Sequence, residues 1–282
     1  MITVLEVIKR TTDFLAGKGI ENPRLNAEQI VGHALALKRM QLYLQFERPL
    51  TEPELEKIRP LVRRRSLREP LQHILGEIDF FGLKLKTDRR ALIPRPETEY
   101  LLELIVAKLP EPPKSILDLG TGSGAIALGL ANHFPLAQVT AVDVSAVALE
   151  LARENATATG FSERVTFLLS DWFSQVDPTA RFDLIVANPP YLSETEVAAA
   201  EPEVRDFDPK AALTPGGDGS TALTAILAKA REHLADHGLL ALETGIGQHA
   251  ALLGLSKESG FTRAESAKDL TGRDRFIFAW PA

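Results

Sequence analysis

The chain has 282 residues, of which 45% are hydrophobic and 25% charged, and its formal net charge is −6. This length suits one main domain with a smaller companion, and no apolar run reaches the roughly 18 residues that a membrane-spanning helix needs. With no cysteine, a disulfide framework, a thiolate zinc site and a cysteine nucleophile are excluded. The first residues lack the basic-then-apolar pattern of a signal peptide, so we expect a cytoplasmic protein.

Residues 1–71 are predicted to form a small all-helical domain. Apolar residues recur at helical spacing over residues 3–16 and again after Asn22-Pro23. A third helix is expected after Thr51-Glu52-Pro53-Glu54, which combines an N-cap, an early proline and a capping-box acid.

The charge of this first segment differs from that of the rest. Residues 1–75 carry 13 Lys and Arg against 9 Asp and Glu, whereas the remainder carries 19 against 29. A solvated helix face is the plainer interpretation of this difference. The sharper one is that the basic run Arg63-Arg64-Arg65, with Arg68, contacts an acidic partner.

Residues 72–92 are predicted to form a β-hairpin linker. Apolar residues alternate roughly from Gln72 onward, with Gly76 and Gly82 as turn residues. A proline-rich stretch, Pro94–Glu99, then leads into a helix expected at Tyr100–Leu109.

Residues 93–282 show alternating strand and helix patterns, which are typical of a parallel sheet covered on both faces. Helices are expected at about 124–133, 146–158, 219–235 and 247–259. The predicted parallel strands are Ser115–Leu119, Val139–Val144, Val165–Leu169, Phe182–Ala187 and Leu239–Glu243. A last pair, near Phe261–Ser266 and Asp274–Trp280, has no long helix between its members and should form an antiparallel hairpin at one sheet edge. The predicted fold class is therefore α/β.

A glycine-rich turn follows the first of these strands, in Asp118-Leu119-Gly120-Thr121-Gly122-Ser123-Gly124. Glycines there permit unusual φ values and let a ligand approach the backbone. Asp143 ends the second strand, at the position that accepts hydrogen bonds from ribose hydroxyls. The spacing suits a nicotinamide dinucleotide, and it also resembles the first motif of S-adenosylmethionine-dependent methyltransferases.

Three features favour the methyltransferase. Asp118 recurs in methyltransferase loops and has no role in pyrophosphate binding. Asp171 and Trp172 follow the third strand, where an acid and an indole can hydrogen-bond and flank an adenine ring. The closing antiparallel pair resembles the methyltransferase sheet, whose last strand is inserted antiparallel.

The fourth strand ends at Asn188-Pro189-Pro190-Tyr191, because neither proline can donate to a sheet ladder. This sequence matches the motif of enzymes that methylate a planar, conjugated nitrogen. The Asn188 side-chain oxygen and the Pro189 carbonyl can accept the NH₂ hydrogens, and Tyr191 can stack on the planar group. The motif leaves three substrates open: adenine in DNA, guanine in RNA, or a glutamine amide in protein.

A wider resemblance separates these substrates. Gly76–Gly82, Leu92–Glu99, Ala211–Leu213 and Gly216–Gly219 look like the corresponding segments of the release-factor glutamine methyltransferases, as does the helical first domain. The resemblance implies a seven-stranded Rossmann-like sheet and methyl transfer from S-adenosylmethionine to N5 of the glutamine in the Gly-Gly-Gln motif of class 1 peptide chain release factors. S-adenosylhomocysteine would be the product.

The same resemblance implies particular site residues and partners. Residues 1–71 would dock the release factor, and Glu243 and Arg95–Glu99 would lie near the site. We expect a monomer that uses no metal and has neither a membrane nor a nucleic acid as partner. The cofactor residues would be Gly120, Thr121, Gly122, Ser123, Gly124, Asp143, Asp171, Trp172 and Asn188, and the catalytic ones Asn188, Pro189, Pro190 and Tyr191.

Two alternatives stay open. An amino methyltransferase acting on adenine or guanine would need a basic groove, which the net acidic residues 76–282 disfavour. A non-catalytic binding module would need neither the glycine turn nor the Asn-Pro-Pro-Tyr motif.

Overall fold

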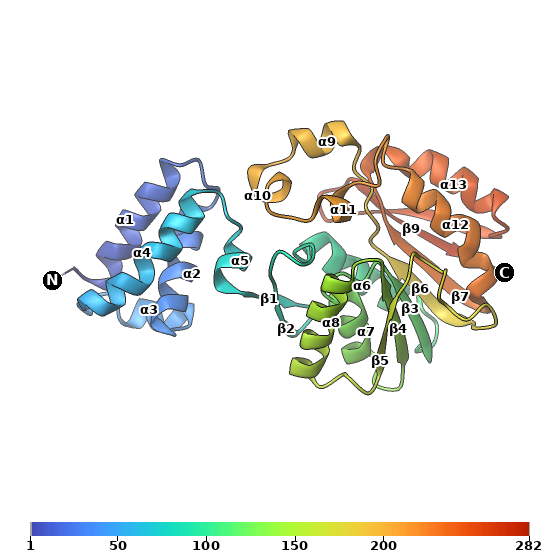
Figure 1. The fold of residues 1–282 in the computed structure, drawn as a ribbon, viewed down its shortest axis with the longest axis horizontal. Helices are drawn as coiled ribbons and strands as arrows, with labels where there is room; N and C mark the ends of the chain where they lie inside the picture. Colours follow the sequence, from blue (N-terminus) through green and yellow to red (C-terminus); the bar gives the residue numbers. More distant parts are fainter. Residues whose placement is uncertain (1, 282) are drawn as a thin grey trace. The chain divides into compact units, whose positions relative to one another are not determined.

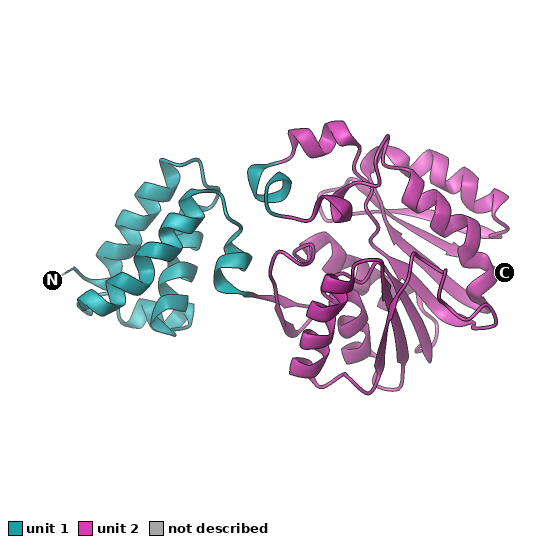
Figure 2. Ribbon diagram, in the orientation of Figure 1, with its two compact units in different colours: residues 1–76, 201–207 teal, residues 77–200, 208–282 magenta. Residues whose placement is uncertain are grey.

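The computed structural model describes residues 2–281 and divides into two compact units (Figure 2). The first unit runs to Gly76 and also takes in Glu201–Phe207, while the second comprises Glu77–Ala200 and the chain from Asp208 onward. Among the described residues, no helix is both long and apolar enough to span a membrane. The first unit is helical, and the second contains a large sheet (Figure 1).

The helical unit forms because several apolar stripes meet in one core. Its longest helices begin at sequence-encoded caps: in the first of them Thr3 Oγ1 accepts from the Glu6 N–H, and the Glu6 carboxylate accepts from the Thr3 N–H. Ile8, Leu15 and Ile30 are among the residues buried between them. The helices are α1 (Val4–Ala16), α2 (Pro23–Leu35), α3 (Arg39–Leu44), α4 (Glu52–Ser66), α5 (Leu71–Leu75) and α10 (Pro202–Arg205).

Most arginines of the basic run, Arg63–Arg65 with Arg68, form ion pairs within this unit. Arg65 is only 6% exposed, and its Nη2 lies 2.9 Å from Glu203 Oε1. Arg64 and Arg68 also form ion pairs within the unit. Of the four arginines only Arg63 is exposed. The local charge pattern does not reveal these pairings, because Glu203, which is distant in the sequence, supplies one of the carboxylates.

The hairpin is shorter than predicted. It consists of β1 (Glu77–Phe80) and β2 (Leu83–Lys86), paired antiparallel. Residues 72–75, predicted as part of it, belong instead to α5, which begins after Pro70 and ends at Gly76 with φ 76°. Too few residues lie between that proline and that glycine for periodicity to separate a helical turn from a strand.

The second unit is organised around a seven-stranded sheet of order β5-β4-β3-β6-β7-β9-β8. The strands are β3 (Ser115–Leu119), β4 (Gln138–Asp143), β5 (Val165–Leu169), β6 (Phe182–Ala187), β7 (Leu234–Glu243), β8 (Arg263–Lys268) and β9 (Asp274–Trp280). The pairs from β5 through β7 are parallel, whereas β9 lies antiparallel between β7 and β8. This confirms the predicted sheet and its inserted antiparallel last strand.

Helices cover both faces of this sheet (Figure 1). Along β6, Leu184 and Val186 face one apolar core with α6 and α7, whereas Ile185 and Ala187 face the other with α12 and α13. Because both faces are buried, β6 reads as a continuous apolar run. The helices of this unit are α6 (Pro96–Lys108), α7 (Ala125–His133), α8 (Ala146–Thr159), α9 (Glu194–Ala199), α11 (Lys210–Leu213), α12 (Thr221–His233) and α13 (His249–Glu258), with a short 3₁₀ helix at Ile246–Gln248.

Two differences from the predicted helices affect the site. α6 begins at Pro96 and not at Tyr100, because a proline is well tolerated in the first turn of a helix. The earlier start places Thr98 on α6. Short helices α9 and α11 were not predicted, since each is too short to show a helical period.

The strand order reverses next to β3, where β4 lies on one side and β6 on the other. At such a switch point the loops after neighbouring parallel strands diverge, and ligands bind in the resulting crevice at their carboxyl ends. The fold thus puts the residues after β3, β4 and β6 around one crevice.

Candidate active site

A cavity of about 620 Å³ opens at the carboxyl ends of the parallel strands. Its wall includes residues from the glycine turn after β3, the ends of β4 and β6, and the segment after β5. Of the sequence-predicted site residues, those that line it are Gly120, Thr121, Gly122, Ser123, Asp143, Asp171, Trp172, Asn188 and Pro190. Gly124, Pro189 and Tyr191 lie outside this lining set.

The glycine turn is shaped by residues with positive φ. Gly120 has φ 73° and Gly122 has φ 56°, a region that L side chains rarely adopt. The N–H groups of Gly120 and Thr121 both donate to the Val142 carbonyl, at 2.9 Å each. The turn is therefore fastened to the end of β4 through its backbone.

Asp143 fastens the same turn from the other side. Its Oδ2 accepts from the Gly122 N–H and its Oδ1 from the Ser145 N–H, both at 2.8 Å. Burial raises the pKa of this carboxyl, and these backbone hydrogen bonds oppose the rise. Asp143 also lines the cavity, where a carboxylate can accept further hydrogen bonds from a ligand.

Asp118 lies beneath the turn and is fully buried. Its Oδ2 accepts from Thr121 Oγ1 at 2.6 Å and from the Ala127 N–H at 3.1 Å. Burial raises its pKa to about 7, although both hydrogen bonds act in the opposite direction. Asp118 therefore supports the turn and the start of α7, and it does not line the cavity.

The segment after β5 supplies the opposite wall. Trp172 has φ 46°, and its indole lies against Gly120, where an added Cβ would be 3.5 Å from the ring. Ser170 Oγ donates to the Trp172 carbonyl at 2.8 Å and accepts from the Gln175 N–H at 3.0 Å. These bonds hold the turn that carries Asp171 and Trp172 into the cavity wall.

Asn188 lines the cavity after β6, across β3 from Asp143 at the end of β4, and is joined to two residues from other elements. Its Nδ2 donates to Thr98 Oγ1 at 2.9 Å, and that hydroxyl donates to Glu243 Oε2 at 2.7 Å. No described residue donates a hydrogen bond to Asn188 Oδ1. Thr98 and Asn188 both line the cavity, whereas Glu243 lies below them and is 1% exposed.

Tyr191 takes a different position from the one expected of a ring that stacks on a substrate. It packs against the core on the α12 side, and its hydroxyl donates to Glu243 Oε1 at 2.9 Å. Arg275 Nη1 lies 3.3 Å from the same hydroxyl. Burial, with the nearby Glu243 charge, raises the pKa of Tyr191. The ring therefore packs on the core and is not among the residues that line the cavity.

Glu243 is the buried acid that these contacts share. Burial raises its pKa, whereas the hydrogen bonds from Thr98 and Tyr191 and the charge of Arg275 lower it. Its two oxygens receive separate hydroxyl donors, so both lone-pair edges are engaged. The sequence carries no local signal for the Thr98–Glu243 contact, because the two residues are 145 positions apart.

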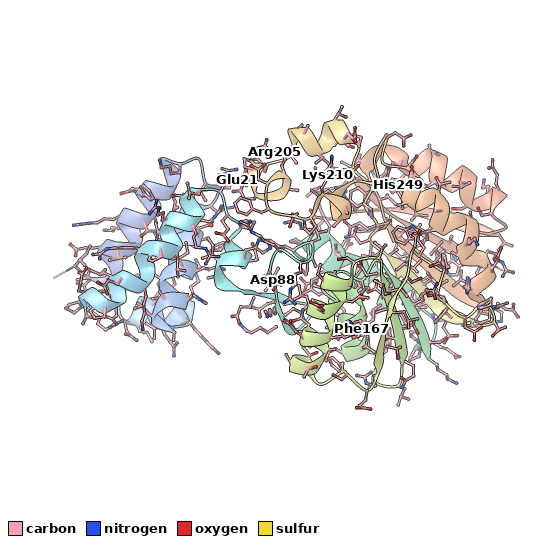
Figure 3. All side chains as sticks on the ribbon, viewed as in Figure 1. Glu21, Asp88, Phe167, Arg205, Lys210 and His249 are labelled. Atoms are coloured by element: carbon pink, nitrogen blue, oxygen red, sulfur yellow. The ribbon has the colours of Figure 1, made fainter. Side chains whose placement is uncertain are left out.

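A further wall comes from the segment around α11, whose first residue, Lys210, is labelled among the side chains in Figure 3. Pro209, Ala212 and Thr214 from this segment line the cavity. Asp208, just before them, is buried and receives a 2.5 Å hydrogen bond from Arg95 Nη2. Sequence reasoning missed this wall, since its short helix carries no periodic signal.

The chemistry of the cavity follows from this donor set. Within residues 2–281 there is no cluster of three or more His, Asp or Glu side chains arranged to hold a metal ion. The cavity offers a backbone turn, acids at the ends of β4 and β5 and an indole on one side of β3, and an amide oxygen after β6 on the other. It can hold a small ligand with hydrogen-bonding groups and present a hydrogen-bond acceptor to a second molecule.

The sheet with its inserted antiparallel strand, and the glycine turn fastened to an acid at the next strand end, define a Rossmann-like methyltransferase. Solved structures with similar folds agree. A methyltransferase from Pyrococcus furiosus superposes with a TM-score of 0.52 at 21% identity, over 71% of this chain and 89% of its own. The T. thermophilus 16S rRNA methyltransferase RsmC, in complex with AdoMet and guanosine, gives 0.54 at 20% identity, over 73% and 50%.

Sequence comparisons identify the family. Residues 6–76 match the family model for the PrmC N-terminal domain, and residues 97–218 match that for the methyltransferase small domain. The release factor glutamine methyltransferase of Geobacter sulfurreducens is 42% identical over 275 residues, 98% of this chain and 95% of the relative. That of Chlorobaculum tepidum is 43% identical over 285 residues, 97% and 95% of the two chains. The chain belongs to the release factor glutamine methyltransferase family, which confirms the resemblance inferred from the sequence.

Proposed function

We propose that this enzyme transfers the methyl group of S-adenosylmethionine to the side-chain amide nitrogen of the glutamine in the Gly-Gly-Gln motif of class 1 release factors. The observation that carries the proposal is the position of Asn188. It lines the same cavity as the glycine turn, with its Nδ2 engaged by Thr98 and its Oδ1 free of described donors.

The residues of the cavity suit S-adenosylmethionine. A volume of about 620 Å³ lies within the range of small-molecule sites. Asp143 would accept hydrogen bonds from the ribose hydroxyls, and Asp171 and Trp172 would contact the adenine. The backbone of the turn would contact the remainder of the cofactor through the residues Gly120, Thr121, Gly122, Ser123 and Gly124.

The protein's own part in the reaction is to hold a weak nucleophile in the reactive orientation. An amide nitrogen is a poor nucleophile, because its lone pair is delocalised into the carbonyl. The Asn188 side-chain oxygen and the Pro189 carbonyl would accept the two NH₂ hydrogens, which orients the nitrogen and favours positive charge on it. S-adenosylmethionine supplies an electrophilic methyl group on a sulfonium. Because that methyl is already activated, the proposed chemistry needs no metal.

The proposal extends to the partner. Residues 1–71 would dock the release factor, supported by the family match of residues 6–76. A nucleic-acid substrate is disfavoured by the net acidic balance of residues 76–282. We propose that a monomer is the working form and that the enzyme acts in the cytoplasm, which its cysteine-free composition suits.

The test uses radiolabelled cofactor with a purified release factor, and peptide mass spectrometry to locate the label. We expect label on the glutamine of the Gly-Gly-Gln motif. Asn188→Ala should abolish labelling while S-adenosylhomocysteine binding survives, and Asn132→Ala, an exposed control on α7, should keep it. Label on DNA or RNA in place of the release factor would overturn the proposal, and full turnover by Asn188→Ala would remove Asn188 from the mechanism.

A further inference from the structure

Asn188 is the last member of a series of hydrogen bonds whose other members, Thr98 and Glu243, lie outside the Asn-Pro-Pro-Tyr motif. The series runs from Glu243 at the end of β7, through Thr98 on α6, to Asn188 after β6. The heavy-atom distances are 2.7 Å between Thr98 Oγ1 and Glu243 Oε2, and 2.9 Å between Asn188 Nδ2 and Thr98 Oγ1. Both are ordinary hydrogen-bond lengths. Three elements of the fold thus converge on one side-chain amide.

The direction of these hydrogen bonds is set at Glu243. An ionised carboxylate can only accept hydrogen bonds, and a hydroxyl has one hydrogen to donate. Two hydroxyls, those of Thr98 and Tyr191, point at its separate oxygens. Arg275 Nη1 approaches the Tyr191 hydroxyl oxygen, which leaves the tyrosine hydrogen to Glu243. Both hydroxyls therefore donate to Glu243, and these hydrogen bonds and the charge of Arg275 oppose the rise that burial causes in its pKa.

The hydrogen bond from Thr98 to Glu243 determines how the Asn188 amide is oriented. Since Thr98 gives its single hydrogen to Glu243, its oxygen can only accept from Asn188. The asparagine must then turn its NH₂ toward Thr98, which leaves Oδ1 on the other side of the amide. A flipped amide would place two acceptors, Asn188 Oδ1 and the Thr98 oxygen, against each other and would offer NH₂ to an incoming NH₂ group.

We propose that Thr98 and Glu243 are positioning residues that fix the Asn188 amide with Oδ1 toward the acceptor substrate. The inference rests on the proposed function, since it assumes that the substrate presents an NH₂ group to Asn188. Neither residue reacts. Their effect is to remove the second orientation of an amide whose two ends are nearly equal in shape.

The decisive comparison is Thr98→Val against Thr98→Ser in the full-length protein. Valine has the shape of threonine without its hydroxyl, whereas serine keeps the hydroxyl. We expect Thr98→Val to lower kcat by about 10- to 100-fold, which is less than the roughly 100- to 1000-fold loss on removing a group that contacts the transition state, because Thr98 acts through Asn188. Thr98→Ser should retain more than about a third of the wild-type kcat. The Kd for S-adenosylhomocysteine should change by less than about threefold in both variants, because Thr98 acts on the acceptor group.

A second readout does not depend on turnover. In ¹⁵N-labelled protein, the side-chain NH₂ resonance of Asn188, assigned by its loss in Asn188→Ala, should shift in Thr98→Val and return toward its original position in Thr98→Ser. If Thr98→Val does not fold, as judged by thermal melting, Thr98→Ala takes its place in both measurements.

The outcomes separate the two proposals. If the wild-type protein labels no glutamine, the proposed function fails, whatever the resonance does. If it labels the glutamine but Thr98→Val keeps a kcat within threefold of Thr98→Ser with an unshifted Asn188 resonance, the positioning role is overturned and the function stands.

Discussion

At one end of the cavity, which we call the cofactor end (Gly120–Gly124 and Asp143), the contacts join backbone N–H groups to an acid and a carbonyl at the neighbouring strand end. At the acceptor end (Asn188, Thr98 and Glu243), they join three side chains from distant parts of the sequence. The first arrangement depends on local backbone shape, and the second on packing that brings remote elements together. Substitutions should therefore affect the two ends through different measurable quantities.

The largest effect is expected at Gly219, whose backbone lies close to that of Tyr191, three residues after Asn188. Gly219 has φ 83°, and a Cβ there would lie 2.2 Å from the Tyr191 carbonyl oxygen. Gly219→Ala should lower the free energy of unfolding by roughly 4 kcal/mol, the sum of a left-handed alanine and an overpacked contact. Gly217→Ala is the matched control, since Gly217 has φ 60° and nothing within 4 Å of its added Cβ. It should cost about 1 kcal/mol in urea unfolding. Equal losses would show that the contact with Tyr191 carries no weight.

The next effect tests the buried support of the cofactor end. Burial raises the pKa of Asp118 from 3.8 to about 7, so the folded protein holds this proton more tightly than the unfolded chain. The stabilisation is complete below the unfolded pKa and is lost as the pH rises through about 7. Between pH 5 and pH 8, wild type should lose roughly 3 kcal/mol relative to Asp118→Asn, since each pH unit up to the folded pKa costs about 1.4 kcal/mol. Urea unfolding of both proteins without cofactor measures this difference, and parallel pH profiles would contradict it.

A somewhat smaller effect is expected on the affinity for S-adenosylhomocysteine, which should depend on the cofactor end and not on the acceptor end. Asp143→Ala removes the acceptor for the Gly122 N–H and the group proposed to bind the ribose. We expect the Kd for S-adenosylhomocysteine to rise about 100-fold, or roughly 2.7 kcal/mol, in calorimetry. Thr98→Val should leave that Kd nearly unchanged. If both substitutions weakened cofactor binding equally, the division into two ends would be wrong.

The difference between local and long-range contacts also explains which parts of the fold and site could be predicted from the sequence. The glycine turn and Asp143 were found because each depends on the few residues around a strand end, where spacing and residue type carry the information. The parallel strands were found for a similar reason, since burial on both faces leaves an apolar run such as the one in β6. Pro189 and Pro190 marked the end of that strand.

The other features of the site depend on contacts between residues that are distant in the sequence, which local patterns do not reveal. Asn188 and Thr98 are 90 residues apart, and no periodicity indicates which residue of α6 meets the end of β6. Tyr191 was expected to face the substrate, but the structure turns its hydroxyl to Glu243. Residues 72–75 were misread because a single helical turn and a short strand have similar patterns.

The buried Arg65 has a consequence for the order in which the chain is made. Its carboxylate partner, Glu203, lies 138 residues later, although both belong to the helical unit. During synthesis the first 76 residues leave the ribosome well before Glu203 exists, so this guanidinium waits without that carboxylate while most of the sheet is being translated. The helical unit is therefore begun before the sheet and is completed only after the four strands β3 to β6 have been translated.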